Sequence, residues 1–442
     1  MANFALGIDI GGTFTDIVVY DAVRGTSAAH KELTTPEAPH RGVISGIQKL
    51  FGAESIACKD VSRVVHATTL FTNALIERKG APTGLITTAG FRDTLELRRE
   101  HKYELYNLFM ELPRPLVRRS LRLEVPERIG PDGKVELPLD VDALLAAAAK
   151  LKAEGVTSLA VAFLHAYANA THEAQAREVI QARHPELFVS LSSEVAPQIR
   201  EYERTSTTVA NAYIKPLADS YLDLMSREIA GLGIKAPLFM MLSNGGLTHI
   251  DEAKRVPIQL LESGPAAGAL AGSTFGLRSK ARDVLAFDMG GTTAKLAMVE
   301  GGAPLIAYQF EAGRQQRFME GSGLPINIST IELIEIGAGG GSIATIDALG
   351  LLKVGPESAG AAPGPACYQR GGTAPTVTDA NLVLGYLDPA HFLGGRSKLD
   401  QAAAEAALDR LAGDLRVDRI AAAEGVHRVV NTNMAEGIRL VS

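Results

Sequence analysis

The sequence contains only two cysteines, Cys58 and Cys367, in 442 residues. Two thiols are too few for a disulfide framework or a cysteine-ligated zinc site, which suits a reducing compartment. No apolar stretch is long enough to cross a bilayer, and the N-terminus runs directly into an acidic strand pattern instead of a signal peptide. We therefore expect a cytoplasmic protein without membrane contacts.

The chain also lacks a basic stripe of the kind that binds nucleic acid. Its formal net charge is -6 at pH 7, and its densest cationic segment, "PRPLVRRSLRLEVPER", alternates with apolar and acidic residues. Such alternation is typical of a solvated strand edge. We therefore expect no nucleic-acid partner, and instead a small molecule or another protein.

Helical and strand patterns alternate along the middle of the chain. Helical spacing covers residues 141–154 and 171–186, and strand patterns follow at 155–165 and 187–195. A longer helix that breaks near Pro216 precedes a strand at 236–244. Elements of these lengths in this order predict an α/β architecture.

A chain of this length exceeds the usual size of one core, so we expect two domains, 1–190 and 191–442. The glycine- and proline-rich segment 355–375 is predicted to be a long ordered loop that leads into a helix at "TVTDANLVLG". The last stretch has helical spacing but ends without a cap, so the second domain is expected to be truncated at its C-terminus.

Two glycine turns of nearly the same sequence stand out, "IDIGGTFTD" and "FDMGGTTAK". In each, an aspartate lies near the end of an apolar strand, and the two glycines that follow let the backbone turn tightly and approach a ligand. Successive N–H groups in such a turn form a nest for anionic oxygens, and the threonine hydroxyl adds a donor. The predicted phosphate-binding residues are Gly11, Gly12 and Thr13 in the first turn and Gly290, Gly291, Thr292 and Thr293 in the second.

The aspartates in these turns, Asp9 and Asp288, predict a magnesium ion, because a carboxylate beside phosphate needs an intervening cation. Two nests predict ATP, with its phosphates held from both sides between two lobes. The alternative is a pair of β-hairpins that use glycine only for turning, which the repetition disfavours. Neither turn is the lysine-bearing phosphate loop, since no G-x-x-x-x-G-K-[ST] occurs.

A third glycine cluster, "IEIGAGGGSIATID", also follows an apolar run. It departs from the dinucleotide fingerprint because Ser342 stands where a third glycine or alanine is expected, and no convincing helix follows. We expect this cluster, with Gly337, Gly339 and Gly340, to form a further wall of the ATP cleft.

The two glycine turns resemble the phosphate-1 and phosphate-2 motifs of the sugar kinase, Hsp70 and actin superfamily, whose members close two ribonuclease-H-like lobes over Mg-ATP. More closely, the chain resembles the hydantoinase A and 5-oxoprolinase family. That resemblance covers nearly every residue, and its segments are "GIDIGGTFTDIVVYD", "HATTLFTNALIERKGAPTGLITTAGFRD", "EYERTSTTVANAYIKP", "SNGGL", "ESGPAAGALAG", "FDMGGTTAK", "IGAGGGSIA" and "PGPACYQRGGTAPTVTDANLVLG".

The resemblance implies an ATP-dependent hydrolase of cyclic amides such as hydantoin or oxoproline, with a hydantoinase B-type companion subunit. The family also contains ATP-dependent carboxylases of ketones such as acetone and acetophenone. Two departures matter: family members continue well beyond residue 442, and many hydrolase members carry histidine and threonine where this chain has Ile334 and Glu335.

Several residues are candidates for catalysis and substrate binding. His66 is a candidate catalytic residue, because it offers one titratable group. With Thr68, Thr69, Thr72 and Asn73 it is expected to bind the substrate or the transferred phosphate. The alternative is a core histidine beside a threonine-rich helix cap.

Asp379 is a candidate substrate residue, and its alternative is a helix N-cap. Lys295 either balances phosphate charge or lies on the surface. Glu335 is expected to pair with arginine or lysine and to influence the substrate class. Ser263 is expected to begin a helix with proline in its first turn, because G-x-S-x-G is absent.

Three other functions remain open from the sequence: a sugar-type kinase, a chaperone-like or regulatory ATPase, and a non-catalytic subunit that holds a complex together.

Overall fold

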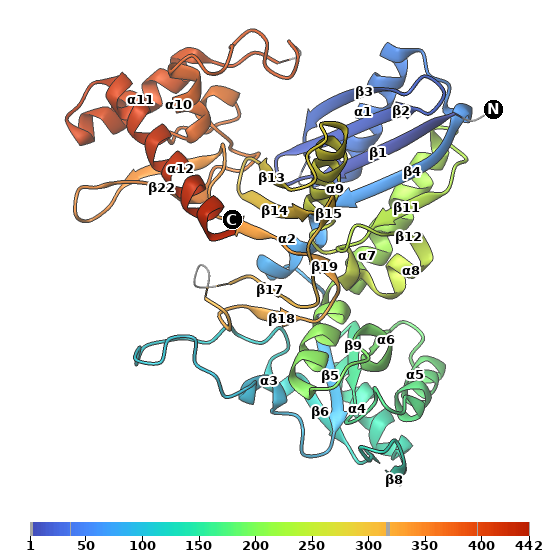
Figure 1. The fold of residues 1–442 in the computed structure, drawn as a ribbon. Coiled ribbons are helices and arrows are strands. Elements are labelled where there is room, and N and C mark those ends of the chain that lie inside the picture. The colour runs from blue at the N-terminus through green and yellow to red at the C-terminus, as the bar shows by residue number, and fades with distance from the viewer. Residues whose placement is uncertain (1–2, 36, 315–318, 396, 442) are drawn as a thin grey trace.

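The computed structural model describes residues 3–441 except residue 36, residues 315–318 and residue 396. The architecture is α/β, as the sequence predicted. Figure 1 shows a six-stranded sheet at the upper right, a four-stranded sheet at the bottom, and the C-terminal helices α10, α11 and α12 at the upper left. Among the described residues, no helix combines the length and apolar composition that a membrane span requires.

The six-stranded sheet has the order β12-β11-β4-β1-β2-β3. β1, β2 and β3 are antiparallel, whereas β1, β4 and β11 run parallel. This is the ribonuclease-H-like arrangement expected for a first lobe. Its strands are β1 Phe4–Ile10, β2 Phe14–Asp21, β3 Thr26–Leu33, β4 Val61–Thr68, β11 Leu238–Met241 and β12 Leu247–His249, and the helices beside it are α1 Pro39–Glu54, α2 Leu70–Ile76 and α8 Ile250–Arg255.

The four-stranded sheet is parallel throughout, with the order β10-β9-β5-β6. Its two central strands are buried along their whole length, as parallel strands covered by helices require. The strands are β5 Thr83–Thr88, β6 Arg122–Val125, β9 Ser158–Ala162 and β10 Phe188–Leu191; the helices are α3 Thr94–Leu97, α4 Val141–Ala153, α5 Thr171–Arg183 and α6 Ser192–Val195; and a small hairpin is formed by β7 Arg128–Ile129 and β8 Val135–Leu137.

The long helix α7, Glu201–Gly231, joins the two sheets. It runs through Pro216 without the break that the sequence predicted, and its buried side chains enter both hydrophobic cores: Tyr221 lies in one and Val209 in the other. The expected domain boundary between residues 190 and 191 falls inside strand β10, ahead of this helix. The six-stranded sheet nevertheless takes strands from both sides of that boundary, because β11 returns to pair with β4.

The second lobe begins with helix α9, Ser263–Arg278, and an antiparallel set in which β14 lies between β13 and β20. These three strands repeat the antiparallel start of the first lobe, and among the described residues the other edge of β13 pairs with no strand. The strands here are β13 Val284–Met289, β14 Ala294–Glu300, β15 Ala303–Pro304, β16 Ile306–Ala307, β17 Phe310–Ala312, β18 Leu324–Ile326, β19 Thr330–Ile331, β20 Ile334–Ile336, β21 Ser342–Ile346 and β22 Leu352–Ser358.

Helices α10 Val377–Val383, α11 Gln401–Leu415 and α12 Arg419–Val441 share a hydrophobic core with β14, β20 and β22. The predicted helix at "TVTDANLVLG" is therefore confirmed as α10. The preceding segment 355–375 starts as the end of β22 and contains one short 3-10 turn, Ala366–Tyr368. The other 3-10 turns are Cys58–Asp60, Arg119–Leu121 and Pro257–Leu260.

Candidate active site

Both glycine turns are the loops of β-hairpins. The first connects β1 to β2 and the second connects β13 to β14. Each is closed by the same hydrogen bond, from the Gly11 amide to the Phe14 carbonyl at 2.9 Å and from the Gly290 amide to the Thr293 carbonyl at 2.9 Å. The repeated sequence thus produces a repeated local structure.

The tips of the hairpins present unused amides. The N–H groups of Gly12 and Thr13, and those of Gly291 and Thr292, donate to no acceptor in the described part of the chain. Gly12 and Thr292 are exposed, whereas Thr13 is buried and its hydroxyl has no hydrogen-bond partner there. Turns that serve only to reverse the chain would not need glycines repeated at both tips, and free amides of this kind suit anionic oxygens.

The two turns touch one another across the lobes. A Cβ added to Gly291 would lie 2.4 Å from the Thr13 hydroxyl oxygen, so only glycine fits at this position. Chain segments almost 280 residues apart therefore meet tip to tip, and any ligand of one turn lies beside the other.

The third glycine cluster packs against the second turn through its backbone. The Gly340 amide donates to the Gly290 carbonyl at 3.0 Å, and the Gly341 amide donates to the Gly291 carbonyl at 2.6 Å. The Gly339 amide donates to the Ser342 hydroxyl at 2.8 Å. These amides hold the second turn in place and have no N–H left for phosphate, while Gly337 lies beside Pro356. No helix follows the cluster, which leads into β21.

Asp9 is the most strongly perturbed acid of the site. Its Oδ1 is buried and has no hydrogen-bond partner among the described residues. Burial, followed by the negative charges of Asp16 and Asp288, raises the pKa of Asp9 to about 7. Asp16 lies directly opposite Asp9 in the β1–β2 ladder, and it is paired with Lys31 at 2.6 Å.

This arrangement fits a cation. A buried carboxylate oxygen without a donor, close to two further carboxylates, is stabilised when a positive ion enters. The described residues contain no group of three or more His, Cys, Asp or Glu side chains that would enclose a metal. Asp9 and Asp288 suit magnesium of the kind that is held by one or two carboxylates and keeps its water.

Lys295 lies opposite Asp288 on the second hairpin and forms an ion pair with Glu262. Burial lowers the pKa of Lys295, but Glu262, Glu335 and Asp288 outweigh that effect, so the net shift is upward. The Glu335 carboxylate is half-exposed and lies 3.8 Å from Lys295, so the expected pairing of Glu335 with a basic residue is confirmed.

The N-terminus of α9 meets the first turn. Ser263 is the first residue of this helix and Pro265 lies in its first turn, which confirms the expected helix start. The Ser263 hydroxyl accepts from the Thr68 amide at 3.1 Å and donates to the Thr68 carbonyl at 3.2 Å. A Cβ on Gly264 would lie 2.9 Å from Asp9 Oδ1, so glycine is required here for the carboxylate to fit.

His66 lies behind the site, in the core. Its side chain is fully buried, and its ring nitrogens lie 3.3 Å from the Ile8 carbonyl and 2.8 Å from the Tyr221 hydroxyl. Burial lowers the pKa of His66 to about 4, so the ring is neutral near pH 7. This geometry favours the core histidine over the catalytic role that the sequence suggested.

The residues after His66 divide into two groups. Thr68 is buried, and its hydroxyl accepts from the amide of Leu70, the first residue of α2, whereas the N-cap residue Thr69 makes no side-chain capping hydrogen bond. Thr69 binds the Ile10 carbonyl through its amide and hydroxyl. Asn73, by contrast, lies beside Gly12: a Cβ on that glycine would be 4.0 Å from the Asn73 amide nitrogen. Asn73 is the member of this group that the structure brings to the first turn.

Asp379 is a structural residue of the segment before α10. It is fully buried and accepts from the amides of Ala366, Cys367 and Thr376 and from the Thr376 hydroxyl. Thr376 is the N-cap and Asp379 completes a capping box at the third helical position. With its oxygens occupied in this way, Asp379 has no free oxygen with which to contact substrate, and the alternative role in capping is favoured.

Sequence reasoning missed Asp16, Lys31, Glu262 and Gly264. The signal for Asp16 was available, because treating the first turn as a hairpin places Asp16 opposite Asp9. Glu262 and Gly264 carried no such signal, since their contacts with Lys295 and Asp9 depend on how α9 packs between the lobes.

Comparison with known proteins shows the family. Family models described as hydantoinase/oxoprolinase N-terminal region and hydantoinase/oxoprolinase match residues 5–184 and 204–442. The chain belongs to the hydantoinase/oxoprolinase family, as its motifs predicted.

Relatives within that family carry several activities in their names. The chain is 38% identical to the caprolactamase subunit alpha of Pseudomonas jessenii, over 100% of this chain and 63% of that protein. It is 32% identical to the acetophenone carboxylase gamma subunit of Aromatoleum aromaticum, over 98% of this chain and 60% of the relative. It is also 41% identical to an uncharacterized protein of Methanocaldococcus jannaschii, over 100% of this chain and 65% of that relative.

Solved structures agree with the fold. A nucleotide-free acetone carboxylase matches with a TM-score of 0.86 at 26% identity, over 100% of this chain and 63% of that chain. The ATP-dependent caprolactamase of Pseudomonas jessenii matches with a TM-score of 0.77 at 37% identity, over 99% and 63%. The two-lobed α/β fold that was expected is thus confirmed, and the chain spans less than two thirds of the length of these proteins.

Proposed function

We propose that this chain is the ATP-using subunit of a cyclic-amide hydrolase, with the phosphates of ATP held by the two glycine turns. The observation that carries this proposal is the meeting of two identical hairpin tips, each with free amides, beside the unpaired carboxylate of Asp9. Magnesium bound at Asp9 and Asp288 would neutralise charge that develops on the phosphates. The amides of Gly340 and Gly341 support the second turn, and we propose that the third glycine cluster, with Gly337, Gly339 and Gly340, forms a wall of the ATP cleft behind it.

The chemistry activates an unreactive carbonyl. The amide oxygen attacks the terminal phosphorus of ATP, a C–O–P bond forms, and ADP leaves with the electrons of the broken P–O bond. Water then adds to the carbon, and the C–N bond breaks as the nitrogen takes a proton, which leaves an acyl phosphate. A second water attacks the acyl carbon, and phosphate departs with the original carbonyl oxygen, which leaves the carboxylate. Such a reaction depends on positioned phosphates more than on a side-chain nucleophile. This agrees with a site where His66 and Asp379 are buried and fully bonded.

One finding supports a lactam or hydantoin substrate over a ketone. The chain is more similar to the caprolactamase subunit, at 38% identity, than to the acetophenone carboxylase subunit, at 32%. The fold alone does not separate the two classes, since acetone carboxylase has the higher TM-score. An ATP-dependent ketone carboxylase is therefore the second candidate, and a regulatory or non-catalytic ATPase subunit is the third.

An isotope experiment distinguishes these candidates. The chain and its companion subunit are incubated with ATP and with caprolactam, hydantoin or oxoproline labelled with ¹⁸O in the carbonyl group. Transfer of the label to inorganic phosphate, with one ring opened for each ADP, is the expected result. ADP formation that requires acetone or acetophenone and bicarbonate would replace the hydrolase with the carboxylase. ATP turnover that no substrate stimulates would leave a regulatory ATPase.

A companion subunit is part of this proposal, and one loop is suited to contact it. Residues 103–112 form a loop whose neck is closed by a hydrogen bond from the Tyr103 hydroxyl to the Glu111 carbonyl at 2.7 Å. Asn107 braces the tip, donating to Glu104 at 2.6 Å and accepting from the Phe109 amide at 3.0 Å. The tip carries four apolar side chains that are between 69% and 93% exposed: Leu105, Tyr106, Leu108 and Phe109.

Apolar side chains this exposed mark a contact surface. The names of two relatives, subunit alpha and gamma subunit, support a partner chain, and we propose that this partner is of hydantoinase B type. Tyr106→Ser together with Phe109→Ser is expected to leave the chain folded but to release the companion in size-exclusion chromatography. Leu349→Ser, at a position that is 83% exposed on the β21–β22 turn, is the matched control. If the double variant keeps the companion bound with wild-type affinity, the loop is not the contact.

The thiols of Cys58 and Cys367 are free, which suits the cytoplasmic location we propose.

A further inference from the structure

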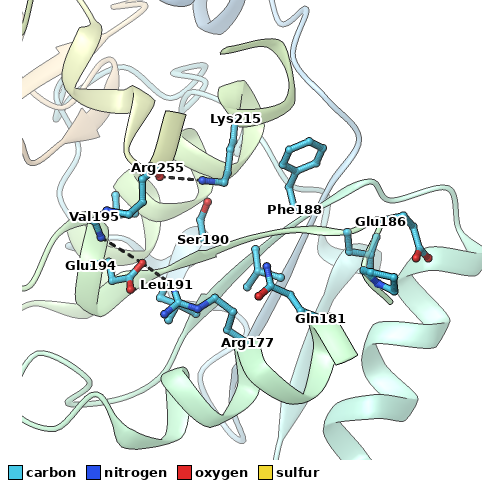
Figure 2. A pocket seen from close by; sticks show the side chains of 13 residues that line it. Arg177, Gln181, Glu186, Phe188, Ser190, Leu191, Glu194, Val195, Lys215 and Arg255 are labelled. Atoms are coloured by element: carbon cyan, nitrogen blue, oxygen red, sulfur yellow. Dashed lines mark hydrogen bonds and ion pairs between the residues drawn. The ribbon is translucent and has the colours of Figure 1, made fainter. Parts of the chain in front are cut away.

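A cavity of about 420 Å³ opens beside the edge strand β10, away from the glycine turns (Figure 2). Helix α5 supplies Arg177 and Gln181, strand β10 supplies Phe188 and Ser190, and helix α7 supplies Lys215. None of the residues that line this cavity belongs to the candidate active site. The cavity is therefore a separate feature that the proposed reaction does not use.

Unused hydrogen-bond donors face this space. Lys215 Nζ donates to the carbonyls of Lys254 and Arg255, at 3.0 and 2.9 Å, which leaves one of its three N–H bonds free. The buried Ser190 hydroxyl accepts from Asn211 at 3.0 Å and has no acceptor for its own hydrogen in the described chain. The exposed side-chain amide of Gln181 has no hydrogen-bond partner among the described residues. Figure 2 shows Lys215, Ser190 and Gln181 around the same space.

The charges of the cavity also favour an anion. Arg177 and Arg255 are paired with Glu194, and Arg255 also with Glu252, whereas Lys215 forms no ion pair among the described residues and is the cation left for an anion. Arg177 binds both oxygens of Glu194 at 2.8 Å through Nη1 alone, so its other N–H groups stay free. Burial lowers the pKa of Lys215, a shift that a bound anion would oppose.

The remaining wall is apolar. Leu187, Val189, Leu191 and Val195 line the cavity from within the hydrophobic cores, and Phe188 and Pro185 are the apolar residues of the wall that remain accessible. An inorganic anion would satisfy the donors but leave Phe188 and Pro185 against water. A ligand with a hydrocarbon body and one anionic end would cover both parts of the surface.

We propose that this cavity binds a small organic carboxylate, with its anionic end at Lys215, Ser190 and Gln181 and its hydrocarbon body on Phe188 and Pro185. The structural role of Lys215, which caps the end of α8 through two carbonyls, is compatible with this second role because its third N–H remains free.

The test is isothermal titration calorimetry of the full chain with hexanoate, with neutral hexanamide as the matched ligand and inorganic phosphate as the anion without a hydrocarbon body. Hexanoate is expected to bind with one site and to raise Tm, and hexanamide and phosphate are expected to bind at least about tenfold more weakly. Absence of hexanoate binding at about 10 mM would overturn the proposal, and so would equal binding of hexanamide or of phosphate.

Gln181→Glu places a carboxylate at an exposed helix position of the cavity without changing the size of the side chain. It is expected to weaken hexanoate binding about tenfold, because like charges would face each other. Gln48→Glu, at an exposed position of α1, is the charge-matched control and should bind as the wild type does. Lys215→Gln is the second variant, with circular dichroism to show that α8 and the fold persist. Wild-type affinity in a folded Gln181→Glu or Lys215→Gln chain would contradict the assignment.

Discussion

At the scale of single residues, Asp9 determines how the site responds to pH. Its pKa is raised from 3.8 to about 7, so the folded chain keeps this proton between about pH 4 and pH 7, where the unfolded chain has lost it. The stabilisation that this proton provides is complete at low pH and is lost as the pH rises through that window.

Asp9→Asn should therefore stabilise the nucleotide-free chain at pH 8, by on the order of 1–3 kcal/mol, and have little effect near pH 4. Urea unfolding at the two pH values measures this difference. The same variant should lose Mg-dependent ATP turnover, as should Asp288→Ala. Wild-type turnover in either variant would contradict the magnesium site. An equal change in stability at both pH values would show that the pKa of Asp9 is not raised.

Glu335 provides a residue-scale test of substrate choice. Its carboxylate lies 3.8 Å from Lys295, which keeps its closer partner Glu262 when Glu335 is replaced. Glu335→Thr is therefore expected to leave ATP affinity unchanged and to shift the preference among lactam, hydantoin and ketone substrates. Calorimetry with ATP and parallel substrate assays measure both effects, and a large loss of ATP affinity with unchanged preference would refute the assignment.

At the scale of elements, helix α9 contains two glycines with opposite expected behaviour. A Cβ at Gly264 would lie 2.9 Å from Asp9 Oδ1, whereas one at Gly268, a turn further along the same helix, meets nothing within 4 Å. Gly264→Ala should displace Asp9 and lower ATP turnover at least about tenfold. Gly268→Ala should keep activity and stabilise the chain by up to about 1 kcal/mol, because alanine is the better helix former.

Turnover assays and thermal unfolding of the two α9 variants measure these effects side by side. Equal activity in both would mean that the contact between α9 and Asp9 does not matter to the site.

The capping box at α10 gives a prediction of stability without a direct effect on substrate. Asp379 accepts four hydrogen bonds in the core, so Asp379→Asn leaves buried donors facing an amide. We expect a loss of about 2–4 kcal/mol in the free energy of unfolding and an unchanged KM for every substrate. A raised KM in a folded Asp379→Asn chain would restore Asp379 as a substrate residue.

At the scale of the whole molecule, local patterns predicted the elements well. The helix at residues 141–154 appears as α4, and the helix at "TVTDANLVLG" appears as α10, because spacing and capping act within a few residues. The hairpin tips were found because the same short sequence occurs twice. The helix break predicted near Pro216 was wrong, because packing of α7 into two cores outweighs the loss of one helical hydrogen bond.

Contacts between distant segments could not be read in this way. His66 looked like an available titratable group, but whether it faces a ligand or Tyr221 depends on a residue 155 positions away. The pairing of Lys295 with Glu262 and the fit of Gly264 beside Asp9 likewise arise only when α9 packs between the lobes.

The central claim is that the two hairpin tips hold one Mg-ATP, and a crystal structure of the chain with magnesium and a non-hydrolysable ATP analogue tests it most directly. We predict phosphate oxygens within hydrogen-bond distance of the amides of Gly12 or Thr13 and also of Gly291 or Thr292, with magnesium beside Asp9 and Asp288. Phosphates that contact only one tip, or that bind elsewhere on the chain, would contradict the account.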